Sequence, residues 1–391
     1  MNDFYAEARD LFEFTRSIRR DLHRHPELAY QEVRTAGIIA EELSQLGFEV
    51  KTGVAQTGVT GLVNGKAAGK VVLLRFDMDA LPIQEESGAE YASQQPGRMH
   101  ACGHDGHVAI GLTVAKMLHN HLQDLNGTVK LVFQPAEEGA SGALRMIEDG
   151  VLENPASDFA LALHLWNDKP AGWLGITPGP ILAGADFFTV QIEGRGGHGA
   201  LPQDTVDPVN ATAQIILALQ SIVSRNVSPL QSAVISVTRV QTGTALNVIP
   251  STAEFSGTIR TFETSVHRMV LERFKEIVSG VAAAMGCTTK IQFNDPCPAV
   301  VNDPVITNIV AEAALKTWPE AKIENNYRAM VSEDMSEILQ RVPGCYFMIG
   351  SANQARGLVY GHHNSRFDFD EAVLPGACAV MTAAVHQILN H

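Results

Sequence analysis

Short apolar runs and longer amphipathic stretches alternate along the first half of the chain. The runs at 71–76, 129–133 and 159–163 predict buried strands, because strands covered on both faces read as continuous apolar segments. The stretches at 5–46 and 105–122 predict helices. Strands that alternate with helices favour an α/β domain, with helices on both faces of a mixed sheet.

The middle of the chain follows a different order of elements. The pattern predicts a strand at 186–195, a helix from Asp207 onward, two strands at 232–240 and 252–260, a helix at 264–285 and a final strand at 288–294. This order is that of a ferredoxin-like domain. Asp295-Pro296-Cys297-Pro298 reads as a linker, after which the α/β pattern resumes. The sequence therefore predicts an α/β domain over 1–185 and 298–391, interrupted by an inserted α+β domain over 186–297.

Charge and cysteine usage narrow the classes of partner. The 391-residue chain has 29 Lys and Arg against 43 Asp and Glu, a formal charge of −14, and no basic run, which argues against a nucleic-acid or anionic membrane surface. No run approaches ~18 apolar residues and the N-terminal segment has no basic region before an apolar core, so we expect neither a membrane span nor a secretory signal. The five cysteines form no CxxC pair, and their odd number favours the reducing cytoplasm.

The densest group of chemically reactive residues is the segment 100–107, His-Ala-Cys-Gly-His-Asp-Gly-His. If the chain turns at Gly103, Cys102 and His104 can face one point, and a thiolate with a neutral imidazole is a good ligand pair for a borderline-soft divalent metal. The plainer interpretation is a polar loop with a hydrogen-bonded core histidine.

Three other segments offer further ligands. Glu137 and Glu138 follow a predicted buried strand, where one carboxylate can ligate a cation while the other acts on water; an acid pair at a helix N-terminus is the alternative. His164 is expected to end the third strand as a further ligand, and the alternative is that it is a lone histidine of the core. His362 and His363, near the C-terminus, add two more imidazoles. Together these residues suffice for two metal ions.

With these motifs the sequence resembles the dinuclear metal amidohydrolases related to aminoacylase and carboxypeptidase, especially the hippurate hydrolases and the auxin–amino-acid conjugate hydrolases. The resemblance runs from Asp21-Leu22-His23-Arg24-His25-Pro26-Glu27-Leu28 to Asp368-Phe369-Asp370-Glu371. It implies that Glu137 is the general base and that Asp79 orients a metal-bound histidine. It also implies metal ligation by Cys102, His104, Glu138, His164 and His363. Ser365 stands where the family pattern has Pro, in the segment that favours His363 over His362.

The inserted domain has its own motif at 194–202, Gly-Arg-Gly-Gly-His-Gly-Ala-Leu-Pro. Its glycines match a dinucleotide pattern, but the next helix begins only after Asp207-Pro208, so we reject a nucleotide site. The resemblance implies that His198 reaches the oxyanion from a partner subunit, and that Asn247 and Arg260 hold the substrate carboxylate. The plainer interpretations are a loop at a strand end for His198 and an ordinary strand-edge charge for Arg260.

The resemblance implies hydrolysis of the amide bond of N-acyl-amino acids such as hippurate-like, N-acetyl or indoleacetyl conjugates. It also implies a homodimer or homotetramer and an inserted domain that acts in closure and dimerisation. Two divalent ions are expected per subunit; the thiolate ligand favours zinc, and manganese, cobalt and nickel are workable. A dipeptidase or aminopeptidase on the same scaffold is one alternative. A non-catalytic binding protein is another.

Overall fold

A computed structural model describes residues 3–390, apart from the side chain of Asp295. The chain divides into two compact units. The first comprises Met1–Ile181, Val301–Tyr327 and Asp334–His391, and the second comprises Leu182–Val300 and Arg328–Glu333. The second unit therefore includes a short segment, Arg328–Glu333, that the hydrophobic pattern does not separate from its surroundings.

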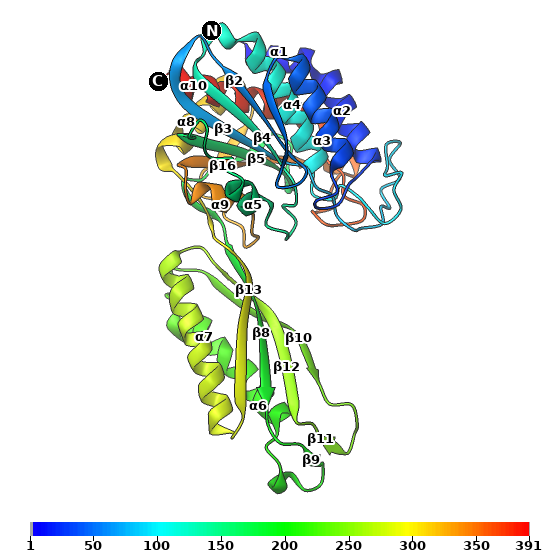
Figure 1. Cartoon of the computed structure of the whole chain (residues 1–391), viewed down its shortest axis with the longest axis vertical. Helices are drawn as coiled ribbons and strands as arrows, with labels where there is room; N and C mark the ends of the chain where they lie inside the picture. The colour runs from blue at the N-terminus through cyan, green and yellow to red at the C-terminus, as the bar shows by residue number, and fades with distance from the viewer. Residues whose placement is uncertain (1–2, 391) are drawn as a thin grey trace. The chain divides into compact units, whose positions relative to one another are not determined.

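The first unit is built on an eight-stranded mixed sheet in the order β1-β2-β4-β3-β5-β16-β6-β15 (Figure 1). Strands β4, β3, β5 and β16 are parallel neighbours, whereas β1 and β2 are antiparallel additions. The strands are β1 (Glu49–Val54), β2 (Gly58–Asn64), β3 (Ala67–Asp77), β4 (Asn126–Gln134), β5 (Phe159–Pro170), β6 (Trp173–Gly175), β15 (Lys322–Glu324) and β16 (Gly344–Ala352).

Helices cover both faces of this sheet, as the sequence predicts. Along β4, Val129, Leu131 and Phe133 belong to the core shared with α4 and α10, whereas Lys130 between them points to the side of α5. Successive strand residues face opposite sides, so these helices lie on different faces. The helices are α1 (Phe4–Asp10), α2 (Phe12–Arg24), α3 (Val33–Gln45), α4 (His104–Asn120), α5 (Gly142–Glu148), α8 (Pro304–Thr317), α9 (Met335–Leu339) and α10 (Leu374–Asn390).

Two details of the first unit differ from the sequence prediction. The expected helix at 5–46 is three helices, because the chain leaves helical geometry at Leu11 and again between Arg24 and Val33. Strand β5 does not end at His164 but continues to Pro170, where its pairing with β16 extends the ladder, so His164 lies inside the strand.

Among the described residues, Glu371–Asn390 is the one stretch long and apolar enough to cross a membrane by length and composition. In the most apolar 18-residue part of this stretch, 83% is buried inside the protein. The stretch ends with α10, which packs on α4, α8 and the strands β3 and β4. Its apolar composition is therefore accounted for by its place in the core.

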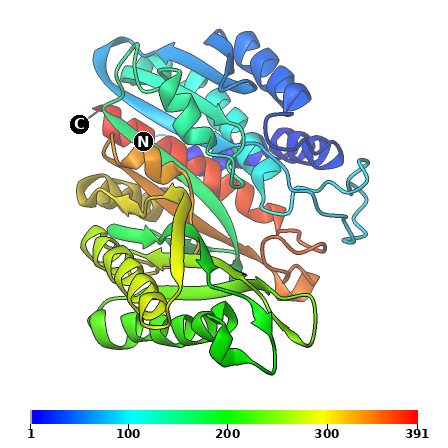
Figure 2. The same cartoon turned by 60° about the horizontal axis from the view of Figure 1, so that its bottom comes forward.

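The second unit is a four-stranded antiparallel sheet in the order β10-β12-β8-β13 with two helices. Its elements are β8 (Gly184–Glu193), α6 (Pro208–Ser221), β10 (Ala233–Thr242), β12 (Thr252–Thr261), α7 (Thr264–Ala284) and β13 (Thr288–Cys297). Both helices pack against the sheet through one apolar core (Figure 2). This is the predicted ferredoxin-like arrangement.

The end of the second unit's sheet differs from expectation. Residues 295–297, predicted as a linker, belong to β13, which remains paired with β8 as far as Cys297 and Ala185. In addition to the long elements, the short strands β9 (Gly197–His198) and β11 (Val248–Ile249) form a small antiparallel pair at one end of the unit (Figure 1). Elsewhere, β7 (Gly179–Leu182) pairs with β14 (Val300–Asn302).

Candidate metal centre

Polar side chains gather where the parallel strands β3 and β4 end and α4 begins. β3 ends at Asp77 and β4 at Gln134, so the segments of Asp79 and Glu138 leave the sheet at the same edge. Gly103 has φ of 92°, a left-handed conformation that glycine adopts without strain, and it turns the chain between Cys102 and His104. The turn at Gly103 expected from the sequence is thus present.

The predicted metal ligands and the predicted base lie together. Ligand atoms lie within 4.8 Å of one another in three overlapping groups, and each group shares a member with the next. These groups are Cys102, His104 and His164; Cys102, Glu138 and His363; and His104, Glu137 and Glu138. The five ligands and the base that the resemblance implies are therefore part of a single cluster in the first unit.

Asp79 fixes the orientation of two of these residues. The Nδ1 of His104 lies 2.9 Å from the carbonyl oxygen of Asp79 and 3.2 Å from its carboxylate, so Nδ1 carries the proton and donates. The other carboxylate oxygen of Asp79 accepts from the Glu138 backbone N–H at 3.0 Å. This arrangement leaves His104 Nε2 buried and without a hydrogen-bond partner among the described residues. It is the geometry expected of a residue that orients a metal-bound histidine.

Cys102 and His164 form the most buried part of the cluster. His164 Nδ1 donates to the carbonyl of Leu165 at 2.6 Å, and its Nε2 lies 3.5 Å from the Cys102 sulfur. Burial, aided by neighbouring imidazoles, lowers the pKa of His164, which keeps the ring neutral with a free lone pair on Nε2. Burial and the nearby carboxylates raise the pKa of the Cys102 thiol, so a bound cation is what would hold it as a thiolate.

Of the two adjacent C-terminal histidines, His363 faces the cluster. Its Nε2 lies 3.2 Å from Glu138 Oε1, and its positive φ of 64° is fixed by the bond from its N–H to the Ala101 carbonyl. His362 instead accepts a hydrogen bond from the Asn167 N–H through Nε2. Burial, with the neighbouring imidazoles, lowers the pKa of His362 to about 3, so this ring is neutral.

The residues present fit divalent metal ions. His104 Nε2 is a buried atom without a hydrogen-bond partner among the described residues, which is costly unless something else binds it. A thiol, three imidazoles and a carboxylate form a donor set typical of zinc and similar ions. With Glu137 beside them, these donors are sufficient for two ions.

Sequence reasoning left His107 and Asp77 without a role in the cluster. His107 Nδ1 contacts Asp77 Oδ1 at 2.5 Å, and its Nε2 accepts from the Leu165 N–H at 3.0 Å, so neither ring nitrogen is free to ligate. The ring therefore holds the strand that bears His164. Its place three residues after His104, on the same side of α4, was the available signal.

The remaining predicted residues lie in the second unit, but not together. His198 in β9 and Asn247 beside β11 are neighbours, since the Gly199 N–H donates to the Asn247 carbonyl at 2.8 Å. His198 Nδ1 accepts from the Ala200 N–H at 3.0 Å, which in the neutral ring places the proton on Nε2. Arg260 lies near the opposite end of the 10-residue strand β12, a length of about 30 Å at ~3.3 Å per residue.

A cluster of cysteine, histidine and glutamate side chains at one edge of an α/β sheet is the kind of site that a metal-dependent hydrolase uses. Residues 73–387 match the model of peptidase family M20/M25/M40, and the chain belongs to this family.

Similarity to characterised members extends over nearly the whole chain. The thermostable carboxypeptidase 1 of Saccharolobus solfataricus is 39% identical over 97% of this chain and 96% of its own. An IAA-amino acid hydrolase (ILR1-like 4) of Arabidopsis thaliana is 39% identical over 98% of this chain and 88% of its own. The crystal structure of Bacillus subtilis YXEP, a dinuclear metal-binding M20 peptidase, has a TM-score of 0.86 and 33% identity, with 98% of this chain and 99% of that one covered.

Proposed function

We propose that this enzyme hydrolyses the amide bond of N-acyl-amino acids and releases a carboxylic acid and a free amino acid. The observation that supports this proposal most strongly is the single cluster formed by the five ligand candidates and Glu137. Relatives named as an IAA-amino acid hydrolase and a carboxypeptidase both act at an amide bond next to an amino-acid residue.

The chemistry divides between the ions and the side chains. When bound, two divalent ions polarise the scissile carbonyl and lower the pKa of the attacking water. Cys102, His104, Glu138, His164 and His363 would hold them. Glu137, half-buried beside Glu138, takes the proton from the attacking water and later delivers it to the leaving amine. Asp79 keeps His104 and Glu138 in place through their hydrogen bonds.

We assign the substrate carboxylate to Arg260. Its side chain is half-buried and bonds only Thr258 Oγ1 at 2.6 Å and the Ile259 carbonyl at 3.5 Å. Burial lowers the pKa of this guanidinium, the charge of Asp186 opposes the shift, and none of the described carboxylates forms an ion pair with it. A half-buried guanidinium without an ion pair is suited to a substrate carboxylate, which it can bind through two hydrogen bonds.

His198 and Asn247 are assigned to the same reaction from a second copy of the chain. Within the second unit of a single chain, His198 and Asn247 are separated from Arg260 by most of the length of β12. This distance is too large for all three side chains to contact one small substrate. A homodimer removes this conflict, because the paired strands β9 and β11 of a second copy can supply His198 Nε2–H to the oxyanion.

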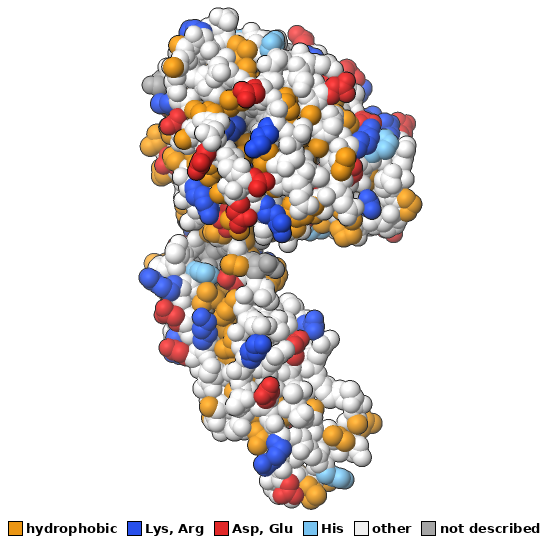
Figure 3. Space-filling view, in the orientation of Figure 1, with side chains coloured by type: hydrophobic (Ala, Val, Ile, Leu, Met, Phe, Trp, Pro, Cys, Tyr) orange, Lys and Arg blue, Asp and Glu red, His pale blue; other side chains and the backbone are white. Residues whose placement is uncertain are grey.

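Exposed apolar side chains support this assembly. On the second unit they include Leu201, Val240, Leu246 and Val248 near the paired strands β9 and β11, and Leu217 on α6. Figure 3 shows hydrophobic side chains on the surface at the end of the unit that bears β9 and β11. We further propose zinc as the native metal, since a thiolate is among the ligands, with manganese, cobalt or nickel able to replace it. The five free thiols are consistent with a cytoplasmic enzyme.

A substrate panel tests the proposal. Enzyme reconstituted with zinc would be assayed on N-acetyl, benzoyl and indoleacetyl amino acids, on the corresponding amino-acid amides, and on unblocked dipeptides. We expect turnover of the N-acyl acids, little turnover of the amides that lack the carboxylate, and loss of activity with a chelator that added metal restores. Preferential cleavage of unblocked dipeptides would assign the enzyme to the dipeptidases instead.

A further inference from the structure

We propose that Arg19 is a positioning residue for the metal centre: from α2 it ties together the two chain segments that bear His104 and His363. This inference rests on the proposed metal-dependent function, because it adds a residue to the same site. Arg19 lies outside the cluster of candidate ligands and was not singled out by any sequence motif.

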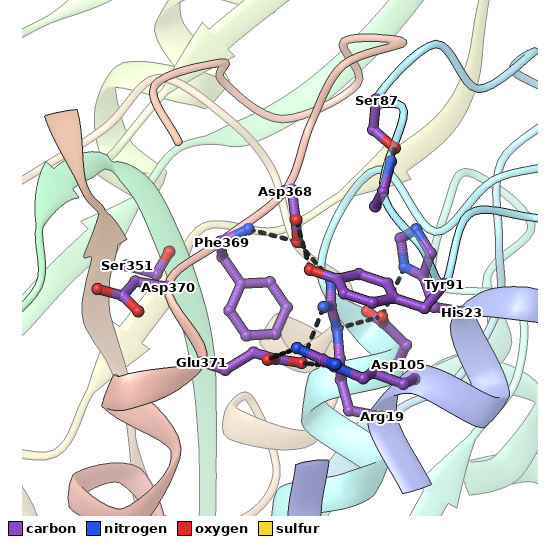
Figure 4. Close-up of polar contacts among 12 residues, drawn as sticks. Arg19, His23, Ser87, Tyr91, Asp105, Ser351, Asp368, Phe369, Asp370 and Glu371 are labelled. Atoms are coloured by element: carbon purple, nitrogen blue, oxygen red, sulfur yellow. Dashed lines mark hydrogen bonds and ion pairs between the residues drawn. The ribbon is translucent and has the colours of Figure 1, made fainter. Parts of the chain in front are cut away.

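The Arg19 guanidinium is completely buried and binds three carboxylates at once (Figure 4). Its Nε donates to Asp105 at 2.9 Å, its Nη2 to Asp368 at 2.7 Å and its Nη1 to Glu371 at 3.1 Å. The plane of the group lies against the ring of Phe369, with Cζ 4.3 Å from the ring centroid. Each of the three guanidinium nitrogens thus donates to a different carboxylate, a pattern that the single ammonium group of lysine cannot reproduce.

Two of the three carboxylates belong to segments that present a metal ligand. Asp105 directly follows His104 in the first turn of α4, and its position is fixed further by a 2.8 Å contact with His23 Nδ1. Asp368 lies on the same C-terminal loop as His363, and Tyr91 donates to its second oxygen at 2.7 Å. Besides the hydrogen bond from the His363 N–H to the Ala101 carbonyl, Arg19 therefore provides a side-chain link between two segments that are remote in sequence but must hold their ligands at a fixed separation.

A purely structural ion cluster would stabilise the fold without affecting the metal. The two roles make different predictions for Arg19→Lys, which keeps the positive charge but replaces a three-branched planar donor by one nitrogen. Under the positioning role, the folded variant binds metal more weakly because the His104 and His363 segments are no longer held at one separation. Under a structural role, only the melting temperature changes.

Lys130 provides a matched control for the loss of a buried cation. Its ammonium group is buried on β4 and donates to the carbonyls of Val151, Glu153 and Pro155 at 2.7–2.9 Å, away from every candidate ligand. Lys130→Met therefore lowers stability through lost hydrogen bonds, whereas the segments of His104 and His363 keep their contacts with Arg19.

The experiment measures zinc affinity by competition with a chromophoric chelator, at a temperature where circular dichroism shows each variant folded. We expect Arg19→Lys to weaken zinc binding about 10- to 100-fold, the range found when residues that support ligands are changed. We expect Lys130→Met to stay within about twofold of the wild type, because distant sites act independently. The visible spectrum of the cobalt-loaded protein should change for Arg19→Lys and not for Lys130→Met.

Wild-type zinc affinity and an unchanged cobalt spectrum in folded Arg19→Lys would overturn the inference. If that variant does not fold, Asp368→Asn removes charge from the link to the His363 segment with little change in shape, and it must show the same loss of affinity. A wild-type protein that binds no metal would instead contradict the proposed function itself.

Discussion

Replacing Asp79 by Asn should weaken metal binding by disturbing two ligands together. The Asp79 carboxylate accepts from the Glu138 N–H at 3.0 Å and from His104 Nδ1 at 3.2 Å. In the Asp79→Asn variant, one accepting oxygen becomes an NH₂ group that faces a donor. A hydrogen bond to a charged group contributes about 1.5–3 kcal/mol, and the Asp79 carbonyl, 2.9 Å from Nδ1, still fixes the His104 tautomer. We therefore expect a loss of about 2 kcal/mol, roughly a 30-fold weaker affinity.

Chelator competition with zinc measures this change, and Asp149→Asn is the matched control. Asp149 also accepts from a backbone N–H, that of Ala55 at 2.6 Å, but it lies outside the cluster of candidate ligands. The control should bind zinc like the wild type. An Asp79→Asn protein that is folded and binds zinc as tightly as Asp149→Asn would refute the assignment of Asp79 as the orienting residue.

Two further predictions concern the second unit. Arg260→Met should raise KM for N-acyl-amino acids about 10- to 100-fold, because it removes the charge-assisted pair with the substrate carboxylate. Arg239 is exposed, so Arg239→Met should leave KM unchanged. Equal effects of the two substitutions on KM would contradict the assignment of the carboxylate to Arg260. The hydrogen bond to Asp186, at 2.6 Å, raises the pKa of His267 above 6.5, so this pair stabilises the fold at low pH and its contribution is lost as pH rises through the folded-state pKa. Urea unfolding should therefore show a larger difference between wild type and His267→Gln near pH 5.5 than near pH 9, and a pH-independent difference would show that the pair does not titrate as argued.

The fold class and the cluster of candidate ligands could be predicted from sequence because both depend on local patterns. Apolar runs identify the parallel strands, and the residues just after β3 and β4 reach one edge of the sheet for topological reasons. The turn at Gly103 follows from the conformational freedom of glycine. His164 was identified by residue type, although the continuation of β5 beyond it depends on pairing with β16 and has no local signal.

The contacts that support the site could not be predicted, because they join distant parts of the chain. Arg19 is separated in sequence from Asp105 by 86 residues, from Asp368 by 349 and from Glu371 by 352. The resemblance predicts His363 rather than His362, but the backbone conformation of His363, with its φ of 64°, has no signal in the sequence pattern. The separation of Arg260 from Asn247 becomes visible only once the strand register is known.

Glu137→Gln, assayed for metal content and turnover in the same preparation, tests the central claim most directly. The change removes a base while keeping size and shape, and none of the other five cluster residues is altered. We predict unchanged zinc stoichiometry and a kcat on N-acyl-amino acids lower by about 10²- to 10⁴-fold, the usual contribution of a general base. A variant that keeps both its zinc and near-wild-type turnover would contradict the account.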